Sequence, residues 1–158
     1  MPIHLGILVP IAIAIPNLLS LVLPPVNIPK NLPKESKPFV ILERLGQIGV
    51  FLTPLFYKFD LSSKINTIFF VLMVLCLFVY YTGWARFFIV KREFSVLFAP
   101  LWGIPDPLAI SPILAFVFAS KVLDSLPLFI AALVLAAGHI PITINLYKKT
   151  KNTHIAKS

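Results

Sequence analysis

Six polar side chains stand within or beside long apolar stretches and are the candidates for chemistry: Glu43, Gln47, Tyr80, Arg86, Asp106 and His139. Ionisable groups are costly to insert into a membrane, so those found in apolar segments are the first candidates for binding or proton transfer. All of them except Asp106 are predicted to form the wall of a polar cavity for a small amphiphile or a lipid headgroup. If the protein transports its ligand, a proton relay between Glu43 and His139 is the natural coupling element.

Glu43 and Gln47 are four residues apart, so they share one face of a helix and form a polar stripe. Arg44 or Arg86 is the expected counter-ion of Glu43. In the structural alternative Arg44 reaches the lipid headgroups and Glu43 binds an arginine only to hold helices together. Two small residues on the same helix predict close approach of a neighbouring helix: Gly46 and Gly49.

His139 lies in the sequence Gly-His-Ile-Pro, and Pro141 cannot donate a hydrogen bond to the carbonyl of Ala137. A free carbonyl beside an imidazole is a common element of binding or proton-handling sites. The alternative is a neutral histidine that hydrogen-bonds to a neighbouring helix as a packing contact.

Tyr80 and Arg86 stand near the end of the longest apolar segment, a position typical of an interfacial aromatic and basic belt. Arg86 is also suited to hold a phosphate or a carboxylate. Asp106 precedes the next helix and is expected to cap it, the alternative being an ion pair with Arg86.

The sequence lacks the short motifs of several common enzyme and cofactor-binding sites. The sequence contains no Gly-x-Ser-x-Gly, no His-Glu-x-x-His and no glycine loop for phosphate, and Cys76 is its one cysteine. We therefore predict no metal, no cofactor and no catalytic residue. A membrane enzyme that modifies a lipid, with His139 and Glu43 as acid and base, ranks third among the functional hypotheses.

The composition predicts that the surrounding solvent is a lipid bilayer. Of 158 residues 58% are hydrophobic and 13% charged, with a mean hydropathy of +0.92. A soluble domain of this size needs a larger charged surface. One stretch without Lys, Arg, Asp or Glu, residues 65–85, has 21 residues, and about 20 suffice to cross the hydrocarbon core. We expect an all-α integral membrane protein with one domain over residues 1–147 and a basic cytoplasmic tail over 148–158.

Five apolar segments predict about five transmembrane helices, the fourth of them short: Ile3–Val26, Phe39–Tyr57, Ile65–Val90, Leu108–Val122 and Leu126–Tyr147. Residues 96–107 are apolar but contain Pro100, Pro105 and Pro107, which oppose a regular helix. They predict an interfacial or re-entrant segment anchored by Trp102. The alternative is a long, broken fourth helix that starts near Val96.

Basic residues predict the orientation. With five crossings, ten of the 14 Lys and Arg residues fall on one face and three on the other, Arg44 lying within a helix. Short cytoplasmic loops carry an excess of Lys and Arg, so we expect a multi-pass cell-membrane protein with its N-terminus outside and its C-terminus in the cytoplasm. This pattern accounts for the net charge of +8, and we predict no nucleic-acid binding.

The leading hypothesis is a protein whose cytoplasm-facing polar cavity binds or transports a small amphiphile or a lipid headgroup. The second is an accessory or assembly subunit of a larger membrane complex, whose polar residues would contact a membrane-protein partner or another copy of the chain. A cavity predicts that Glu43, Arg86 and His139 converge, whereas an accessory subunit predicts that polar residues face outward.

Overall fold

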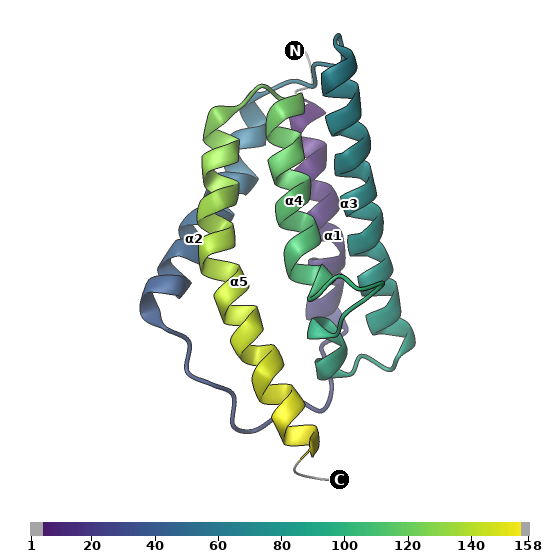
Figure 1. Cartoon of the computed structure of the whole chain (residues 1–158), viewed down its shortest axis with the longest axis vertical. Coiled ribbons are helices and arrows are strands. Elements are labelled where there is room, and N and C mark those ends of the chain that lie inside the picture. Colours follow the sequence, from purple (N-terminus) through teal and green to yellow (C-terminus); the bar gives the residue numbers. More distant parts are fainter. Residues whose placement is uncertain (1–4, 156–158) are drawn as a thin grey trace.

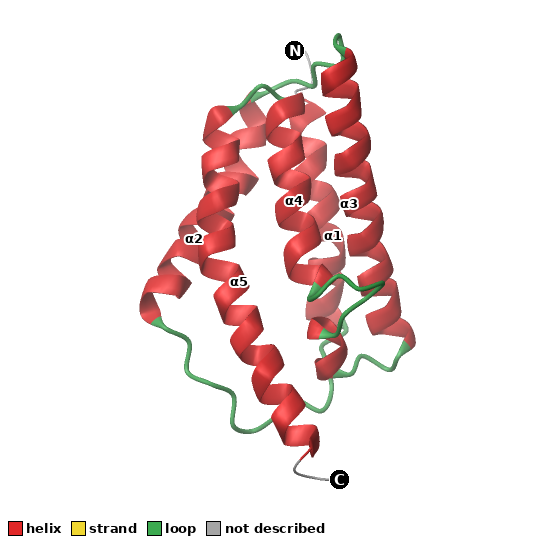
Figure 2. Ribbon diagram, in the orientation of Figure 1, coloured by secondary structure: helices red, strands yellow, loops and turns green. Residues whose placement is uncertain are grey.

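The computed structural model describes the backbone of residues 5–155 and the side chains of residues 5–149. Within this part of the chain every regular element is a helix and there is no strand (Figure 2). The elements are η1 (Leu5–Ile7), α1 (Leu8–Val22), α2 (Lys37–Leu52), η2 (Thr53–Phe56), α3 (Lys64–Ile89), η3 (Phe94–Phe98), α4 (Pro107–Val122) and α5 (Leu126–Ile155). The predicted all-α bundle is confirmed.

Four segments are long and apolar enough to cross a membrane: Leu5–Val22, Lys37–Phe56, Lys64–Ile89 and Leu126–Lys149. The fifth helix, α4, has 16 residues, fewer than the roughly 20 that a full crossing requires. Nine of its 16 residues are buried, and it packs against both α3 and α5. The other helices expose many large apolar side chains. The bundle thus has a buried central helix and an apolar exterior, as expected for a protein surrounded by lipid.

Successive helices run in opposite directions (Figure 1). The connection 57–63 and the turn 123–125 lie at one end, where the backbone N–H of Asp60 donates to the carbonyl of Val122. The connection 23–36 and the start of the connection 90–106 lie at the other end, where Val26 forms backbone hydrogen bonds with Arg92 and Phe94. The segments that carry most of the basic residues therefore gather at this second end, together with the last turns of α5.

Small residues bring α2 and α5 together. A Cβ atom at Gly46 would overlap the backbone of Leu135, and one at Gly49 would overlap the side chain of Ala131. On α5, a Cβ atom at Gly138 would overlap the backbone N of Glu43. The close approach predicted from Gly46 and Gly49 is confirmed, and it fixes an antiparallel register in which residue 138 faces residue 43.

The connection between α3 and α4 is irregular. It contains the short helix η3 and a tight turn in which Leu101 and Ile104 exchange backbone hydrogen bonds, with Trp102 and Gly103 at positive φ. The alternative of a fourth helix from Val96 is wrong, because α4 begins only at Pro107. Prolines along the connection remove the N–H donors that a helix needs.

Trp102 stacks on Phe78 of α3, with ring centroids 6.3 Å apart and ring planes 17° apart. Phe78 lies 11 residues ahead of Ile89, the last residue of α3, which is roughly 16 Å along a helix axis. The connection therefore runs back alongside α3 before α4 begins, as Figure 1 shows. This return explains why α4 is short.

Candidate functional site

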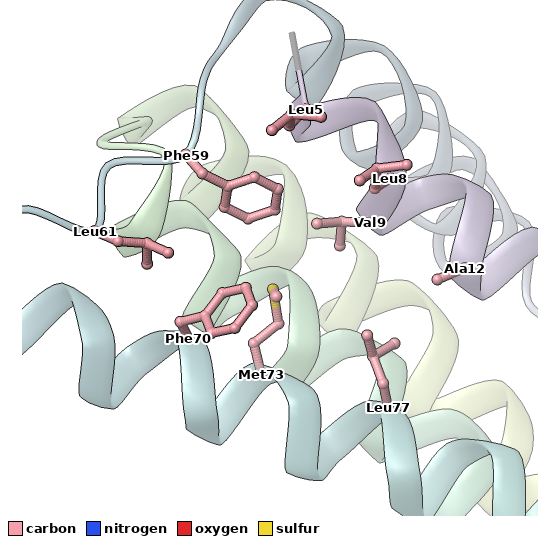
Figure 3. A pocket seen from close by; sticks show the side chains of 9 residues that line it. All are labelled: Leu5, Leu8, Val9, Ala12, Phe59, Leu61, Phe70, Met73 and Leu77. Carbon is pink, nitrogen blue, oxygen red and sulfur yellow. The ribbon is translucent and has the colours of Figure 1, made fainter. Parts of the chain in front are cut away.

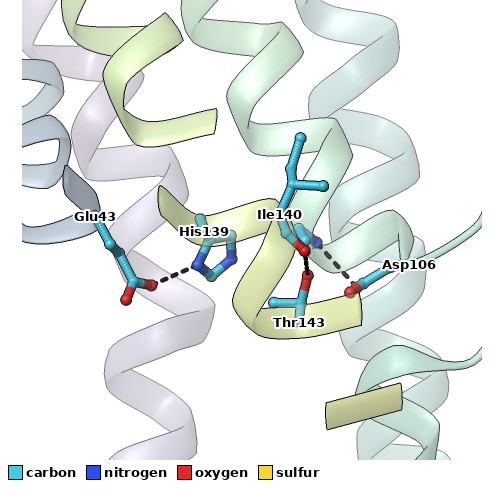
Figure 4. Close-up of polar contacts among 6 residues, drawn as sticks. Glu43, Asp106, His139, Ile140 and Thr143 are labelled. Carbon is cyan, nitrogen blue, oxygen red and sulfur yellow. Dashed lines mark hydrogen bonds and ion pairs between the residues drawn. The ribbon is translucent and has the colours of Figure 1, made fainter. Parts of the chain in front are cut away.

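Glu43 and His139 meet between α2 and α5. The His139 Nδ1 atom lies 2.5 Å from the Glu43 Oε1 atom (Figure 4). The contact follows from the helix register, since Gly138 allows the α5 backbone to touch α2 at Glu43 and the next side chain then lies opposite the carboxylate. With a proton on Nδ1, the imidazole donates a charge-assisted hydrogen bond to the carboxylate. Of the three residues predicted to converge, Glu43 and His139 are in contact, whereas Arg86 binds backbone carbonyls of the connection between α3 and α4 instead.

The pair is only partly covered by protein. The His139 side chain is 28% exposed and that of Glu43 is 17% exposed. Gln47 and Arg44 on the same helix are exposed, and the partner of Glu43 is His139 rather than an arginine. The structure therefore offers an imidazole–carboxylate pair that a molecule outside the bundle can reach.

Arg86 has a different environment. Its Nη1 atom donates to the carbonyl of Pro100 at 2.8 Å and to that of Ala99 at 3.5 Å. Irregular backbone beside a helix needs such partners, because its carbonyls receive no helical hydrogen bonds. Arg86 thus holds the connection between α3 and α4.

Tyr80 is buried in the contact between α1 and α3. Its hydroxyl donates to the carbonyl of Ile13 at 3.1 Å and accepts from the amide Nδ2 of Asn17 at 2.7 Å. The neighbouring Tyr81 donates to the carbonyl of Ala12, which also lies on α1. Tyr80 and Arg86 therefore have contacts of their own and are not neighbours of the Glu43–His139 pair by any hydrogen bond described.

Asp106 caps α4, as predicted. Its Oδ1 atom accepts a hydrogen bond from the backbone N–H of Ala109 at 3.3 Å, and its φ of 45° places it in the left-handed region. Its Oδ2 atom is buried and has no hydrogen-bond partner among the described residues. Burial raises the pKa of this carboxyl, against a smaller opposing effect of the nearby Thr143 hydroxyl, the Ala109 amide and His139. Asp106 is therefore a neighbour of the Glu43–His139 pair on the inner side.

No group of three or more His, Cys, Asp or Glu side chains suitable for a metal occurs in the described part of the chain. His4 and the side chain of His154 lie outside that part. The expectation that the protein holds no metal stays a prediction.

A second feature is an apolar groove of about 400 Å³ between α1, α3 and the connection 57–63 (Figure 3). It lies toward the start of α1, whereas the Glu43–His139 pair lies between α2 and α5. The sequence does not reveal it, because its side chains are of the same types as those that face lipid: Leu5, Leu8, Val9, Ala12, Phe59, Leu61, Phe70, Met73 and Leu77.

Comparison with known proteins adds no relative: no family model, no curated protein and no solved structure matches this chain. The class of protein is thus defined by its fold alone: over residues 5–155 it is a bundle of five α-helices, of which four can cross a membrane by length and composition.

Proposed function

We propose that the chain is a multi-pass protein of the cell membrane, with its N-terminus outside and its C-terminus in the cytoplasm. The alternation of helix directions and the gathering of basic segments at one end support this orientation. Single cysteines test it in a Cys76→Ser background. Ser62→Cys, in the connection 57–63, should react with an impermeant thiol reagent from outside, and Asn31→Cys, in the connection 23–36, only after permeabilisation. The reverse pattern would contradict the orientation.

We further propose that this protein binds or transports a small amphiphile or lipid headgroup at the Glu43–His139 pair. The observation that carries the proposal is the 2.5 Å contact between two partly exposed ionisable side chains on apolar helices. Glu43 lies six residues after Lys37, the first residue of α2, which is roughly 9 Å along the helix axis. A headgroup from the basic side of the membrane reaches such a depth.

The Glu43–His139 pair can serve a polar ligand group as hydrogen-bond donor or as acceptor. Nδ1 of His139 is engaged by Glu43, so its Nε2 atom is the one left to donate to, or accept from, a polar group of the ligand. The rest of the exposed surface of α2 is largely apolar, with Leu45 and Ile48 on other faces of the helix, so the hydrocarbon part of an amphiphile can stay in the lipid while its headgroup meets the pair.

Native mass spectrometry of the detergent-purified protein tests the proposal. Wild type should retain a bound mass that both Glu43→Gln and His139→Ala lose, while Asp60→Asn, which removes one exposed carboxylate, retains it. A bound mass that all four proteins hold equally, or that none of them holds, would contradict binding at this pair.

The second candidate function, an accessory subunit of a membrane complex, draws on Gln47. This amide is exposed on a helix that is apolar enough to cross a membrane, where an unpartnered polar group favours contact with another helix. A second protein that purifies with wild type and is lost with Gln47→Leu supports this function instead.

A further inference from the structure

The Asp106 carboxyl presents an unusual arrangement of buried oxygens. The residue is 9% exposed and uses Oδ1 for the cap of α4, while Oδ2 is buried without a hydrogen-bond partner in the described structure. An ionised oxygen left without a donor away from water is strongly unfavourable. The site must therefore supply either a donor to this oxygen or a proton on it.

The hydroxyl of Thr143, on α5, is the neighbouring polar group. Thr143 is 6% exposed, and its Oγ1 atom donates its single proton to the carbonyl of Ile140 at 3.1 Å. Figure 4 shows the Asp106 carboxyl pointing toward this hydroxyl. With its proton directed to Ile140, Thr143 offers lone pairs to Asp106, which complement a protonated carboxyl. The Thr143 hydroxyl lowers the pKa of Asp106 only when its proton is turned toward the carboxylate.

A protonated Asp106 completes the chain of hydrogen bonds. Its Oδ2–H group would donate to Oγ1 of Thr143, which already donates to the carbonyl of Ile140. Both oxygens of Asp106 and the hydroxyl oxygen of Thr143 then have a partner. In the ionised form, the Thr143 hydroxyl would have to turn its proton from Ile140 to Asp106.

His139 connects this carboxyl to the ligand site. It lies four residues before Thr143 on α5, so both side chains are on one helix face. Among the described charged groups, His139 is the one that acts on Asp106 from a neighbouring helix, while Arg86 of α3 binds the backbone ahead of it.

We infer that Asp106 is a proton-binding site that extends the Glu43–His139 pair inward to the start of α4. One proton from water forms the Oδ2–H bond, and no other reactant is needed. The inference rests on the proposed function in one respect, because His139 belongs to the proposed ligand site and also lies beside the proton site at Asp106. Asp106 lies within electrostatic range of His139, so proton uptake at Asp106 changes the charge that a ligand meets beside the Glu43–His139 pair.

Infrared spectroscopy tests this directly through the carbonyl stretch of a protonated carboxyl. The full chain is titrated with acid in dodecyl maltoside, a detergent without ester or carboxyl groups. Wild type should show a band that is lost in Asp106→Asn and kept in Asp60→Asn, whose carboxylate is exposed. The midpoint of this band should lie at a higher pH than that of the band assigned by Asp60→Asn.

Thr143→Val provides a test in a chain that keeps the carboxyl, should Asp106→Asn not fold. Removing the acceptor hydroxyl should move the band to higher frequency. Identical spectra of wild type and Thr143→Val, or a midpoint for Asp106 no higher than for Asp60, would overturn the inference. If the band behaves as expected while native mass spectrometry finds no ligand at Glu43 and His139, the proposed function fails and the proton site stands.

Discussion

Gly138 lies directly against the backbone of Glu43, and a single added methyl group there would overlap the Glu43 nitrogen. The distance between α2 and α5 therefore depends on the absence of a side chain at this position. The same contact places His139 opposite the Glu43 carboxylate, so helix packing and the candidate site share one determinant.

Gly138→Ala should force α2 and α5 apart and lengthen the contact between Glu43 and His139. Overpacking of a tight interface typically lowers the free energy of unfolding by about 1–3 kcal/mol. We expect a lower midpoint of thermal unfolding in detergent, together with loss of any ligand held by the pair. Ala137→Leu, at an exposed neighbouring position, is the control and should leave the midpoint nearly unchanged. Equal midpoints for wild type and Gly138→Ala would contradict the observed packing.

Tyr80→Phe should weaken the contact between α1 and α3. The substitution removes a donor to Ile13 and an acceptor for Asn17 in a buried position. Interhelical hydrogen bonds in membrane proteins contribute about 0.6–2 kcal/mol each, so we expect a loss of about 1 kcal/mol in reversible unfolding. Tyr81→Phe removes a hydrogen bond of a more exposed side chain and should cost less. A larger effect at Tyr81 than at Tyr80 would be inconsistent with the structure.

Arg86→Gln should loosen the connection 99–106, because the carbonyls of Ala99 and Pro100 lose their charged donor. Hydrogen bonds to charged groups contribute about 1.5–3 kcal/mol, so amide hydrogen exchange at Leu101 and Ile104 should accelerate by about tenfold or more. Lys91→Gln removes a nearby exposed charge and serves as the control. Unchanged exchange in Arg86→Gln would mean that the guanidinium does not hold this segment.

The stability of the protein should depend on the pH through Asp106. Burial raises the pKa of this carboxyl above its ordinary value of 3.8, so the folded state binds the proton more tightly than the unfolded state. The stabilising contribution is complete below pH 3.8 and is lost as the pH rises through the raised pKa. We expect the unfolding midpoint of wild type to fall relative to that of Asp106→Asn over this range. A constant difference between the two proteins at all pH values would contradict the raised pKa.

Most of the fold was predictable, because length and apolar character alone distinguish helices that face lipid. The first and last residues of the helices were less predictable. The first segment was expected to reach Val26 but α1 ends at Val22, just ahead of Pro24 and Pro25, and the fifth was expected to end at Tyr147 but α5 continues to Ile155. Part of the predicted basic tail is thus helical. Hydropathy does not detect such a change, since a helix can leave the membrane without ending.

The candidate site was predictable in its members and less so in their contacts. Glu43 and His139 stood out because ionisable groups are rare in apolar segments, but their contact depends on which helices are neighbours and in what register. The apolar exteriors of the five segments look alike and do not encode that choice. Arg86 shows the same limit, since its partners are backbone carbonyls and carry no signal in the sequence.

The late start of α4 also has a consequence for synthesis of the chain. In the connection 99–106, the carbonyls of Ala99 and Pro100 take their donor from Arg86, which lies 13 and 14 residues earlier in the chain. Because Arg86 leaves the ribosome first, α3 is available as a template when the connection emerges. The order of the sequence thus allows α4 to be placed against an existing helix, and moving α4 ahead of α3 in a circularly permuted chain would remove that order.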